Sequence, residues 1–246
     1  MIGAWATFTR ELWAYFYSPL AYAVLASFLF VNGISFATLI GLLNDSPSAV
    51  GAPMELFFGG TILFWLGLTI VGPILPMRLL SEERRSGSLE ILMTAPVTET
   101  QVVVGKYLAA LSFYAVLWLP TLSYCYLVAR HTEIDWGPIT ASYVGVLGIG
   151  GVFLAVGIFA SSISRNQLVA ALVSFALVFL LFVLGLMEML VNGELAREVL
   201  GYVNLLQHMQ DFSKGVVDTR CLVYYASTVG FFLFLTSRTL AANKWR

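Results

Sequence analysis

Six uncharged apolar segments constrain this chain more than any other feature of its sequence. The first, residues 20–43, would rise about 36 Å as an α-helix, which exceeds the roughly 30 Å hydrocarbon core of a bilayer. Charged residues make up only 11% of the chain and hydrophobic residues 59%, so the chain cannot cover itself with polar surface and we expect lipid to be its solvent. The predicted spans are residues 20–43, 56–77, 107–129, 138–163, 166–187 and 221–237.

These spans predict an all-α integral membrane protein. No stretch of domain size lacks a membrane-length segment, so residues 1–246 are expected to form a single membrane domain. The formal net charge of -1 indicates no bulk electrostatic partner such as nucleic acid. Prolines are expected to modify two spans, with Pro73 and Pro76 kinking or fraying the end of the second and Pro120 bending the third.

The first 19 residues are predicted to form a separate helix that lies in the membrane interface and leads into the first span at an angle. Apolar side chains recur there at spacings of three and four, which indicates one apolar face. Arg10 and Glu11 fall elsewhere, and Ser18-Pro19 breaks the helix. The alternative is that these residues simply begin the first span. The apolar face comprises Trp5, Phe8, Leu12, Tyr15 and Phe16.

The distribution of positive charge predicts the orientation of the chain. Six spans place both termini on one side, and nine of the 13 Lys and Arg residues fall on that side. Loops rich in Lys and Arg stay in the cytoplasm. Both termini and the 78–106 segment are therefore expected to be cytoplasmic.

Two further stretches carry local signals. Residues 138–163 are rich in glycine and alanine, which let helix backbones approach closely in lipid. Residues 188–220 are the longest polar connection on the outer side, and apolar side chains at near-helical spacing predict one or two short amphipathic helices there. We expect this outer segment to act as a lid or substrate gate.

The segment 78–106 is the most polar part of the chain and holds eight of its 27 charged side chains. A hairpin between spans needs only roughly four to eight residues. Nearly thirty residues of charged chain therefore predict a docking surface for a separate protein. The alternative is a solvated loop at the membrane edge, with Arg78 and Lys106 meeting lipid phosphates.

Capping signals divide this segment into short helices. Gly87 can end a first helix in the left-handed conformation, and Ser88 can cap a second helix over residues 88–96. Glu90 in its first turn is favoured by the helix dipole, and Pro96 closes it. A capping box, Thr98 with Gln101, is predicted to start the helix of the third span. The apolar face of the 88–96 helix would consist of Leu89, Leu92 and Met93.

Residues 81–111, SEERRSGSLEILMTAPVTETQVVVGKYLAAL, resemble the signature of type-2 ABC transporter permeases. That signature has an acidic-basic cluster, a Gly-Ser/Thr-Leu-Glu turn, a Leu-rich helix, a Pro and a Gly-Lys pair before the third span. Residues 208–225, HMQDFSKGVVDTRCLVYY, are similar to the outer segment of the gliding-motility-associated branch of the family. No gliding function is inferred from this similarity.

The resemblance implies a bacterial inner-membrane permease subunit with a coupling helix in its first cytoplasmic loop. It implies two permeases, identical or different, two ABC ATPase subunits and outward transport, with an accessory membrane or periplasmic protein and membrane lipids as further partners. The residues that match the motif, and so inherit the ATPase-docking role, are Glu82, Glu83, Arg84, Arg85, Gly87, Ser88, Leu89, Glu90, Leu92 and Pro96.

The chain itself lacks the motif that binds ATP. A P-loop reads G-x-x-x-x-G-K-[ST], but Gly105-Lys106 is followed by Tyr107, and residue 100 is Thr rather than Gly. ATP and Mg are therefore expected on a partner ATPase, and no cofactor is expected in this chain.

Other functions fit the sequence less well. An ion-coupled carrier usually places ionisable residues within its spans, and the six predicted spans have none. A channel would need a filter-like motif, which is missing. The acidic residues and His208 of the outer segment match no metal or hydrolase motif, so neither an enzyme nor a metal site is expected. Cys125 and Cys221 both fall near the outer face, and separate thiols are a better interpretation than a disulfide.

Overall fold

The computed structural model describes residues 2–45, 53–88, 97–131, 134–188 and 193–243, and its regular structure in these ranges is entirely helical. The prediction of an all-α protein is confirmed. The elements are α1 (Ile2–Phe16), α2 (Pro19–Asp45), α3 (Pro53–Glu55), η1 (Leu56–Gly60), α4 (Ile62–Ile74), α5 (Ser81–Ser86), α7 (Glu99–Trp118), η2 (Leu119–Thr121), α8 (Leu122–Ala129), α9 (Trp136–Ile163), α10 (Gln167–Met187), α11 (Glu194–Gly201), α12 (Leu205–Ser213) and α13 (Thr219–Asn243).

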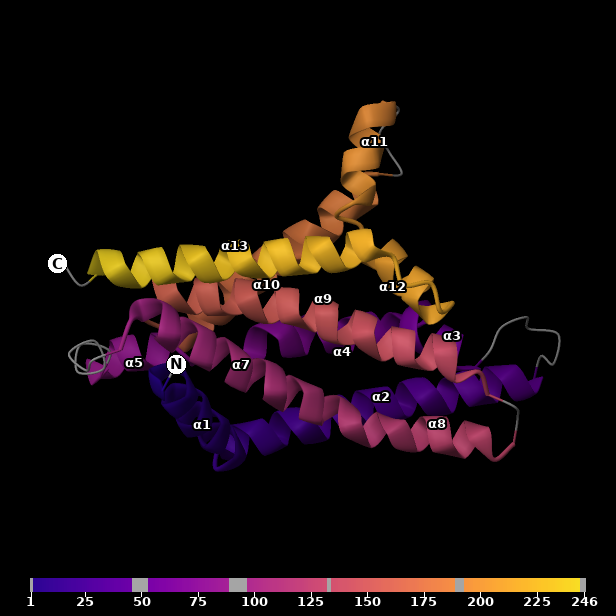
Figure 1. Ribbon diagram of the computed structural model, residues 1–246. Coiled ribbons are helices and arrows are strands. Elements are labelled where there is room, and N and C mark those ends of the chain that lie inside the picture. Colours follow the sequence, from indigo (N-terminus) through magenta and orange to yellow (C-terminus); the bar gives the residue numbers. More distant parts are fainter. Residues whose placement is uncertain (1, 46–52, 89–96, 132–133, 189–192, 244–246) are drawn as a thin grey trace.

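Long helices run side by side along the molecule, while α1 lies obliquely at one end and α11 projects from the bundle (Figure 1). Within the described ranges, five helical segments are long and apolar enough to cross a membrane. The pair Pro53–Gly60 and Ile62–Ile74, bent by 48°, makes a sixth when it is counted as one broken span. The five are Pro19–Asn44, Glu99–Ala129, Trp136–Ile163, Gln167–Met187 and Thr219–Ala242.

The second span, predicted over residues 56–77, departs most from its prediction because it is not one continuous helix. It begins as the short π-helix η1, is interrupted at Thr61 with extended backbone angles (φ -103°, ψ 135°), and continues as α4. The low helix propensity of two successive glycines, Gly59-Gly60, explains why the helix breaks there. The backbone at the break is partly satisfied by side chains, because Thr61 accepts from the Phe64 N–H and Trp65 donates to the Gly59 carbonyl.

The prolines act as predicted. Helix α4 ends at Ile74, directly after Pro73, and irregular turns continue through Pro76 to the start of α5. Pro120 lies in the 3₁₀ turn η2, which separates α7 from α8. The last span is longer than predicted, because α13 begins two residues before Cys221 and continues to Asn243 rather than residue 237.

Helix α9 is the centre of the bundle and contacts α4, α7, α10, α12 and α13. Its glycines make this density feasible, since a Cβ placed on Gly150 would lie 2.2 Å from the buried ring of Tyr114. The prediction that small residues in this span allow close packing is confirmed. Four more α9 glycines have a neighbour within 3.0 Å of such a Cβ, namely Gly145 with Phe212, Gly148 with Tyr225, Gly151 with Tyr107 and Gly157 with Pro76.

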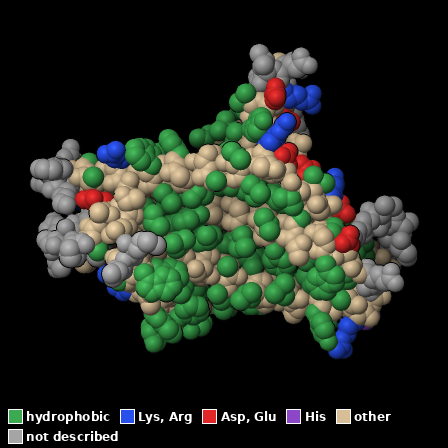
Figure 2. All heavy atoms as spheres, in the orientation of Figure 1, with side chains coloured by type: hydrophobic (Ala, Val, Ile, Leu, Met, Phe, Trp, Pro, Cys, Tyr) green, Lys and Arg blue, Asp and Glu red, His purple; other side chains and the backbone are tan. Residues whose placement is uncertain are grey.

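The surface has the distribution of polarity expected of a protein in a bilayer. Hydrophobic side chains cover the middle of the face in Figure 2, and charged side chains gather at the two ends and on α11. Large apolar side chains point outward from several spans; for example, Phe30 is 69% exposed and Leu172 is also 69% exposed. Apolar exposure on this scale is consistent with contact with lipid.

We predict that Gly150→Ala destabilises the protein by about 1–3 kcal/mol, because the added methyl group collides with the buried Tyr114 ring. Gly41→Ala is the matched control, since a Cβ on Gly41 meets nothing within 4 Å. That change is expected to be neutral or slightly stabilising, through helix propensity. Thermal unfolding in detergent measures both, and equal melting temperatures for the two variants would contradict the role of Gly150.

Candidate functional site at the Lys106 cluster

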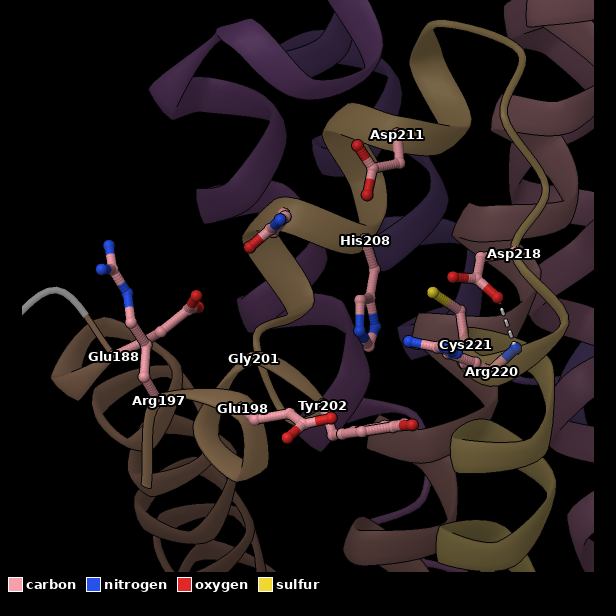
Figure 3. Close-up of a pocket in the computed structure, with 11 residues that line it drawn as sticks. Glu188, Arg197, Glu198, Gly201, Tyr202, His208, Asp211, Asp218, Arg220 and Cys221 are labelled. Carbon is pink, nitrogen blue, oxygen red and sulfur yellow. Dashed lines mark hydrogen bonds between the residues drawn. The ribbon is translucent and has the colours of Figure 1, made fainter. Parts of the chain in front are cut away.

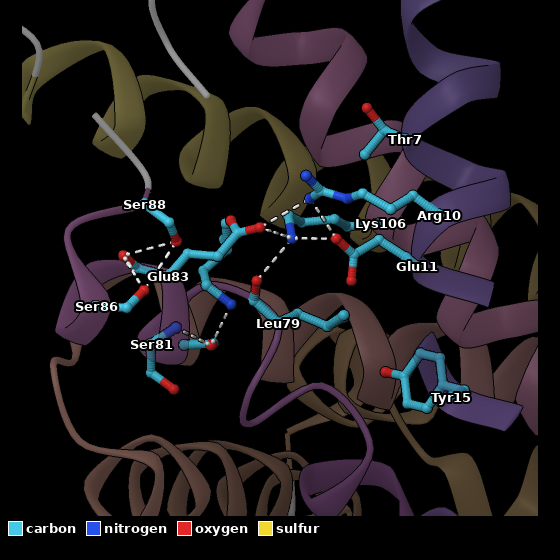
Figure 4. Close-up of polar contacts among 12 residues, drawn as sticks. Thr7, Arg10, Glu11, Tyr15, Leu79, Ser81, Glu83, Ser86, Ser88 and Lys106 are labelled. Carbon is cyan, nitrogen blue, oxygen red and sulfur yellow. Dashed lines mark hydrogen bonds and ion pairs between the residues drawn. The ribbon is translucent and has the colours of Figure 1, made fainter. Parts of the chain in front are cut away.

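A buried ammonium joins the polar segment to the bundle. The Lys106 side chain is 1% exposed, and its Nζ lies 2.8 Å from Glu11 Oε1 and 2.8 Å from Glu83 Oε1 (Figure 4). Its third contact, also 2.8 Å, is with the Leu79 carbonyl. An ammonium has three N–H donors, so each donor of Lys106 has an acceptor.

Arg10 completes this group, which we call the Lys106 cluster (Arg10, Glu11, Glu83 and Lys106). Its Nη2 lies 2.6 Å from Glu11 Oε1 and 2.9 Å from Glu83 Oε1. Two cations and two carboxylates give no net charge, which is the condition under which charges can be buried at tolerable cost. Arg10 is 53% exposed, so the cluster extends from the protein interior to the surface.

Close contact between α1 and α7 brings Lys106 to Glu11. A Cβ on Gly105 would lie 2.7 Å from the Ala4 carbonyl oxygen and 2.9 Å from Thr7 Cβ, so only glycine permits this approach. The Gly-Lys pair of the sequence signature therefore has a physical explanation. The glycine allows α1 to pack tightly, and the lysine that follows it reaches the Glu11 carboxylate.

The apolar face predicted for α1 is in part the buried one. Tyr15 is buried and Leu12 and Phe16 pack against the core, whereas Trp5 is 69% exposed. Glu11, which was predicted to lie elsewhere, points into the cluster. Burial alone would raise the pKa of Glu11, but Lys106 and Arg10 lower it below the ordinary value. The spacing of apolar residues could not include Glu11, because an ion pair and not apolar contact turns this residue inward.

The chain between α4 and α5 is held from two sides. On α9, Ser161 Oγ accepts from the backbone N–H groups of Leu80 and Ser81, at 3.1 and 3.0 Å. On the other side, the Tyr15 hydroxyl donates to the Leu75 carbonyl at 2.8 Å. Arg78 does not stand free toward lipid phosphates, because it donates to Ser18 Oγ at 2.6 Å.

Helix α5 ends and the chain continues as the capping signals predict. Gly87 has φ 72°, the left-handed conformation, directly after Ser86. The described chain resumes before α7, where Thr98 Oγ1 accepts from the Gln101 N–H and Gln101 Oε1 accepts from the Thr98 N–H. Both the glycine stop and the capping box are confirmed.

The predicted docking residues fall into three groups. Glu82 and Arg85 are exposed on α5, while Glu83 and Arg84 are partly buried, with Glu83 in the Lys106 cluster. Ser88 follows the glycine, and its hydroxyl is 2.8 Å from that of Ser86. Residues 89–96 of the predicted 88–96 helix, which include four of the docking residues, lie outside the described residues. These four are Leu89, Glu90, Leu92 and Pro96.

The arrangement of the Lys106 cluster is suited to holding helices together rather than to catalysing a reaction. The Lys106 cluster links α1, α5 and α7, and each donor of its ammonium is occupied. Among the described residues, no group of three or more His, Cys, Asp or Glu is placed to hold a metal ion. Cys125 and Cys221 are both buried free thiols.

The fold and this site define a multi-pass helical membrane protein with a braced polar end. A family model described as ABC-2 family transporter protein matches residues 29–216. That is most of the chain, and the chain belongs to this family. A search of curated proteins found no match. The family makes the chain a permease subunit of an ABC transporter, a class of proteins that works with ABC ATPases.

We predict that Lys106→Met destabilises the protein by about 3 kcal/mol or more, because it leaves two largely buried carboxylates without their shared cation. Thermal unfolding in detergent provides the measurement. Arg10→Met removes a half-exposed cation from the same cluster and should cost only about 0–1 kcal/mol. Adding Glu11→Gln and Glu83→Gln to Lys106→Met should restore much of the loss. Similar losses in the two single variants would show that Lys106 is not the central charge.

The lowered pKa of Glu11 predicts a pH dependence. A carboxylate whose pKa is lower in the folded state stabilises fully above its unfolded value, here 4.5, and loses that contribution as the pH falls through the folded pKa. The stability difference between wild type and Glu11→Gln should therefore stay constant from about pH 7 to pH 5 and shrink as the pH falls below about 4.5 toward pH 3. A difference that stays constant down to about pH 3 would contradict the ionised role of Glu11.

Proposed function

We propose that this chain is the membrane subunit of a bacterial exporter, driven by separate ATPase subunits that dock on residues 78–106. ATP and Mg would be bound by those partners, and the transport path would lie between this chain and a second permease, identical or different. Binding of ATP would draw the ATPases together and move the 88–96 coupling helix, so that the spans on either side of it tilt.

The observation that carries this proposal is the anchoring of α5 through the Lys106 cluster. A coupling segment transmits force only if it is attached to the spans it moves. Here Glu83 on α5 is bound to Lys106 on α7 at 2.8 Å, and Ser161 on α9 holds the N-terminus of α5. Displacement of α5 would therefore act on α1, α7 and α9 as well as on α4.

The surface of α5 supports a protein partner. Glu82 and Arg85 are exposed at the same end of the molecule as both termini (Figure 1). Burial and the nearby Arg165 guanidinium lower the pKa of Arg84, so positive charge is concentrated where α5 approaches the turn before α10. A partner with complementary acidic groups would fit this surface. The excess of Lys and Arg at this side supports a cytoplasmic location.

The alternative is a secondary carrier or channel that works without ATP. One observation bears on it, because two of the five continuous candidate spans hold charged residues, contrary to the expectation that none does. The span Glu99–Ala129 includes Glu99 and Lys106, and Thr219–Ala242 includes Arg220 and Arg238. Of these four residues, Lys106 is the buried one. However, this lysine is saturated by three acceptors and lies near the end of its helix. A carrier needs a group that releases its ion during the cycle, so the cluster favours a bracing role.

We predict that charge reversal on the docking surface uncouples the partner. Glu82→Lys, Arg85→Glu and Glu90→Lys should each reduce the ATPase activity of the co-purified complex severalfold, because each reverses a charge for which the partner surface is expected to carry the opposite charge. Their amounts in the membrane should match wild type. The assay is ATP hydrolysis by the complex in lipid nanodiscs.

Arg130→Glu is the control, since Arg130 is an exposed cation at the opposite end of the bundle. Its complex should hydrolyse ATP at the wild-type rate. Wild-type rates of ATP hydrolysis in all three docking variants would rule out residues 82–96 as the surface on which the ATPase docks. Transport by the purified chain alone would support a carrier that works without ATP.

A further inference from the structure

A polar pocket lies at the opposite end of the bundle from α5, where α10 ends and α13 begins. It has a volume of about 460 Å³, within the range typical of small-molecule sites. Helices α11 and α12 form two of its walls, and the start of α13 forms a third (Figure 3). The proposed coupling to an ATPase involves residues 78–106 and none of the residues that line this pocket.

The pocket carries an excess of negative charge. Among the residues that the structure describes, no ion pair joins its carboxylates to its guanidinium groups, so the charges around the space do not neutralise one another in contact. Four carboxylates and two guanidinium groups leave a formal charge of about -2 when the histidine is neutral. The lining acids are Glu188, Glu198, Asp211 and Asp218, and the lining bases are Arg197 and Arg220.

A buried histidine is directed into this space. His208 is 6% exposed, and its ring lies between α12 and the start of α13 in Figure 3. Nδ1 of the ring has no hydrogen-bond partner among the described residues. Burial lowers the pKa of His208, although nearby Asp211 opposes the shift, so the ring is neutral at pH 7. A neutral imidazole has one donor and one acceptor nitrogen, so Nδ1 can accept a hydrogen bond from a ligand in the tautomer that protonates Nε2.

Aromatic rings complete the surroundings. The Tyr224 and Tyr225 rings lie 5.8 and 5.7 Å from the His208 ring, and Tyr202 lines the pocket with its ring facing the Arg220 guanidinium at 6.0 Å. Aromatic faces and carboxylates are the two surfaces that attract organic cations. The contact with Arg220 shows that a cation can lie over the Tyr202 ring at this end of the molecule.

Other ligands suit the pocket less well. An anion would meet the excess of carboxylates, and its two arginines stand on opposite sides rather than as a pair (Figure 3). A bare metal ion would need ligands grouped around one point, and no such group of His, Cys, Asp or Glu occurs in the described chain. A primary ammonium suits the pocket in two ways. Its positive charge matches the excess of carboxylates, and its N–H groups can donate a hydrogen bond to Nδ1 of His208.

We propose that the pocket between α10, α11, α12 and the start of α13 binds the ammonium group of an organic amine, held by Asp211, Asp218 and the acceptor nitrogen of His208. The amine is either a soluble polyamine or the headgroup of an aminolipid. Both sources carry the same recognised group, and the position beside the ends of two spans makes the pocket accessible from solution and from the membrane surface.

The test uses the full-length protein purified in an uncharged maltoside detergent, with thermal unfolding as the readout. Spermidine is titrated as the soluble amine. Short-chain phosphatidylethanolamine is the lipid amine, and short-chain phosphatidylglycerol is its match without an amine. A saturable rise in melting temperature with spermidine or phosphatidylethanolamine, but not with phosphatidylglycerol, supports the proposal and identifies the source.

The variant Asp211→Asn/Asp218→Asn keeps the shape of both side chains and removes two charges. It should weaken the apparent affinity for the effective amine at least tenfold. Asp135→Asn is the matched control, because Asp135 is exposed outside the pocket and Asn can equally cap α9. The single change Asp218→Asn, at an exposed residue of the same site, replaces the double variant if that variant is unstable.

Three outcomes would overturn the proposal. The first is no saturable stabilisation by either amine, and the second is equal stabilisation by phosphatidylglycerol. The third is unchanged amine affinity in the pocket variants that fold. None of these outcomes depends on the ATPase, so failure here leaves the docking proposal intact, and failure of the docking variants leaves the pocket intact.

Discussion

The contact on which the rest of the structure depends is the one between the Lys106 ammonium and its three acceptors. Without the two carboxylates, a lysine with 1% exposed side chain would carry a prohibitive desolvation cost. With them, the same residue ties together α1, α5 and α7, which are far apart in the sequence. The polar segment is thus part of the folded bundle rather than a loop attached to its edge.

Much of this architecture is predictable from sequence because it follows from local physics. Uncharged runs of membrane length identify the spans, and Gly87 and the Thr98–Gln101 capping box identify where helices stop and start. The glycines of α9 predict close packing. Only the structure shows which residue packs against each glycine, such as Tyr114 against Gly150. These signals are each contained within a few residues of the chain.

The features that the sequence did not reveal are long-range. Glu11 and Lys106 are 95 residues apart, and the charge of Glu11 excluded it from the apolar face of α1 although Tyr15 lies one helical turn away. One signal was present, since Lys106 stands alone in an apolar stretch and needs an acid to neutralise it. The pocket at the other end is similar, because His208 and the acids of residues 188–220 match no motif and become a site only when α11 and α12 fold around a common space.

The interruption at Thr61 gives the second span a particular mechanical character. The part before the break, η1, packs against α12, whereas α4 beyond the break packs against α9 and α10 and leads to α5. Since the two parts already meet at 48°, rotation can be absorbed at one or two residues instead of bending a rigid rod. The interruption therefore gives the span a joint, at which α4 can rotate together with α5 while η1 remains packed against the amphipathic helix α12.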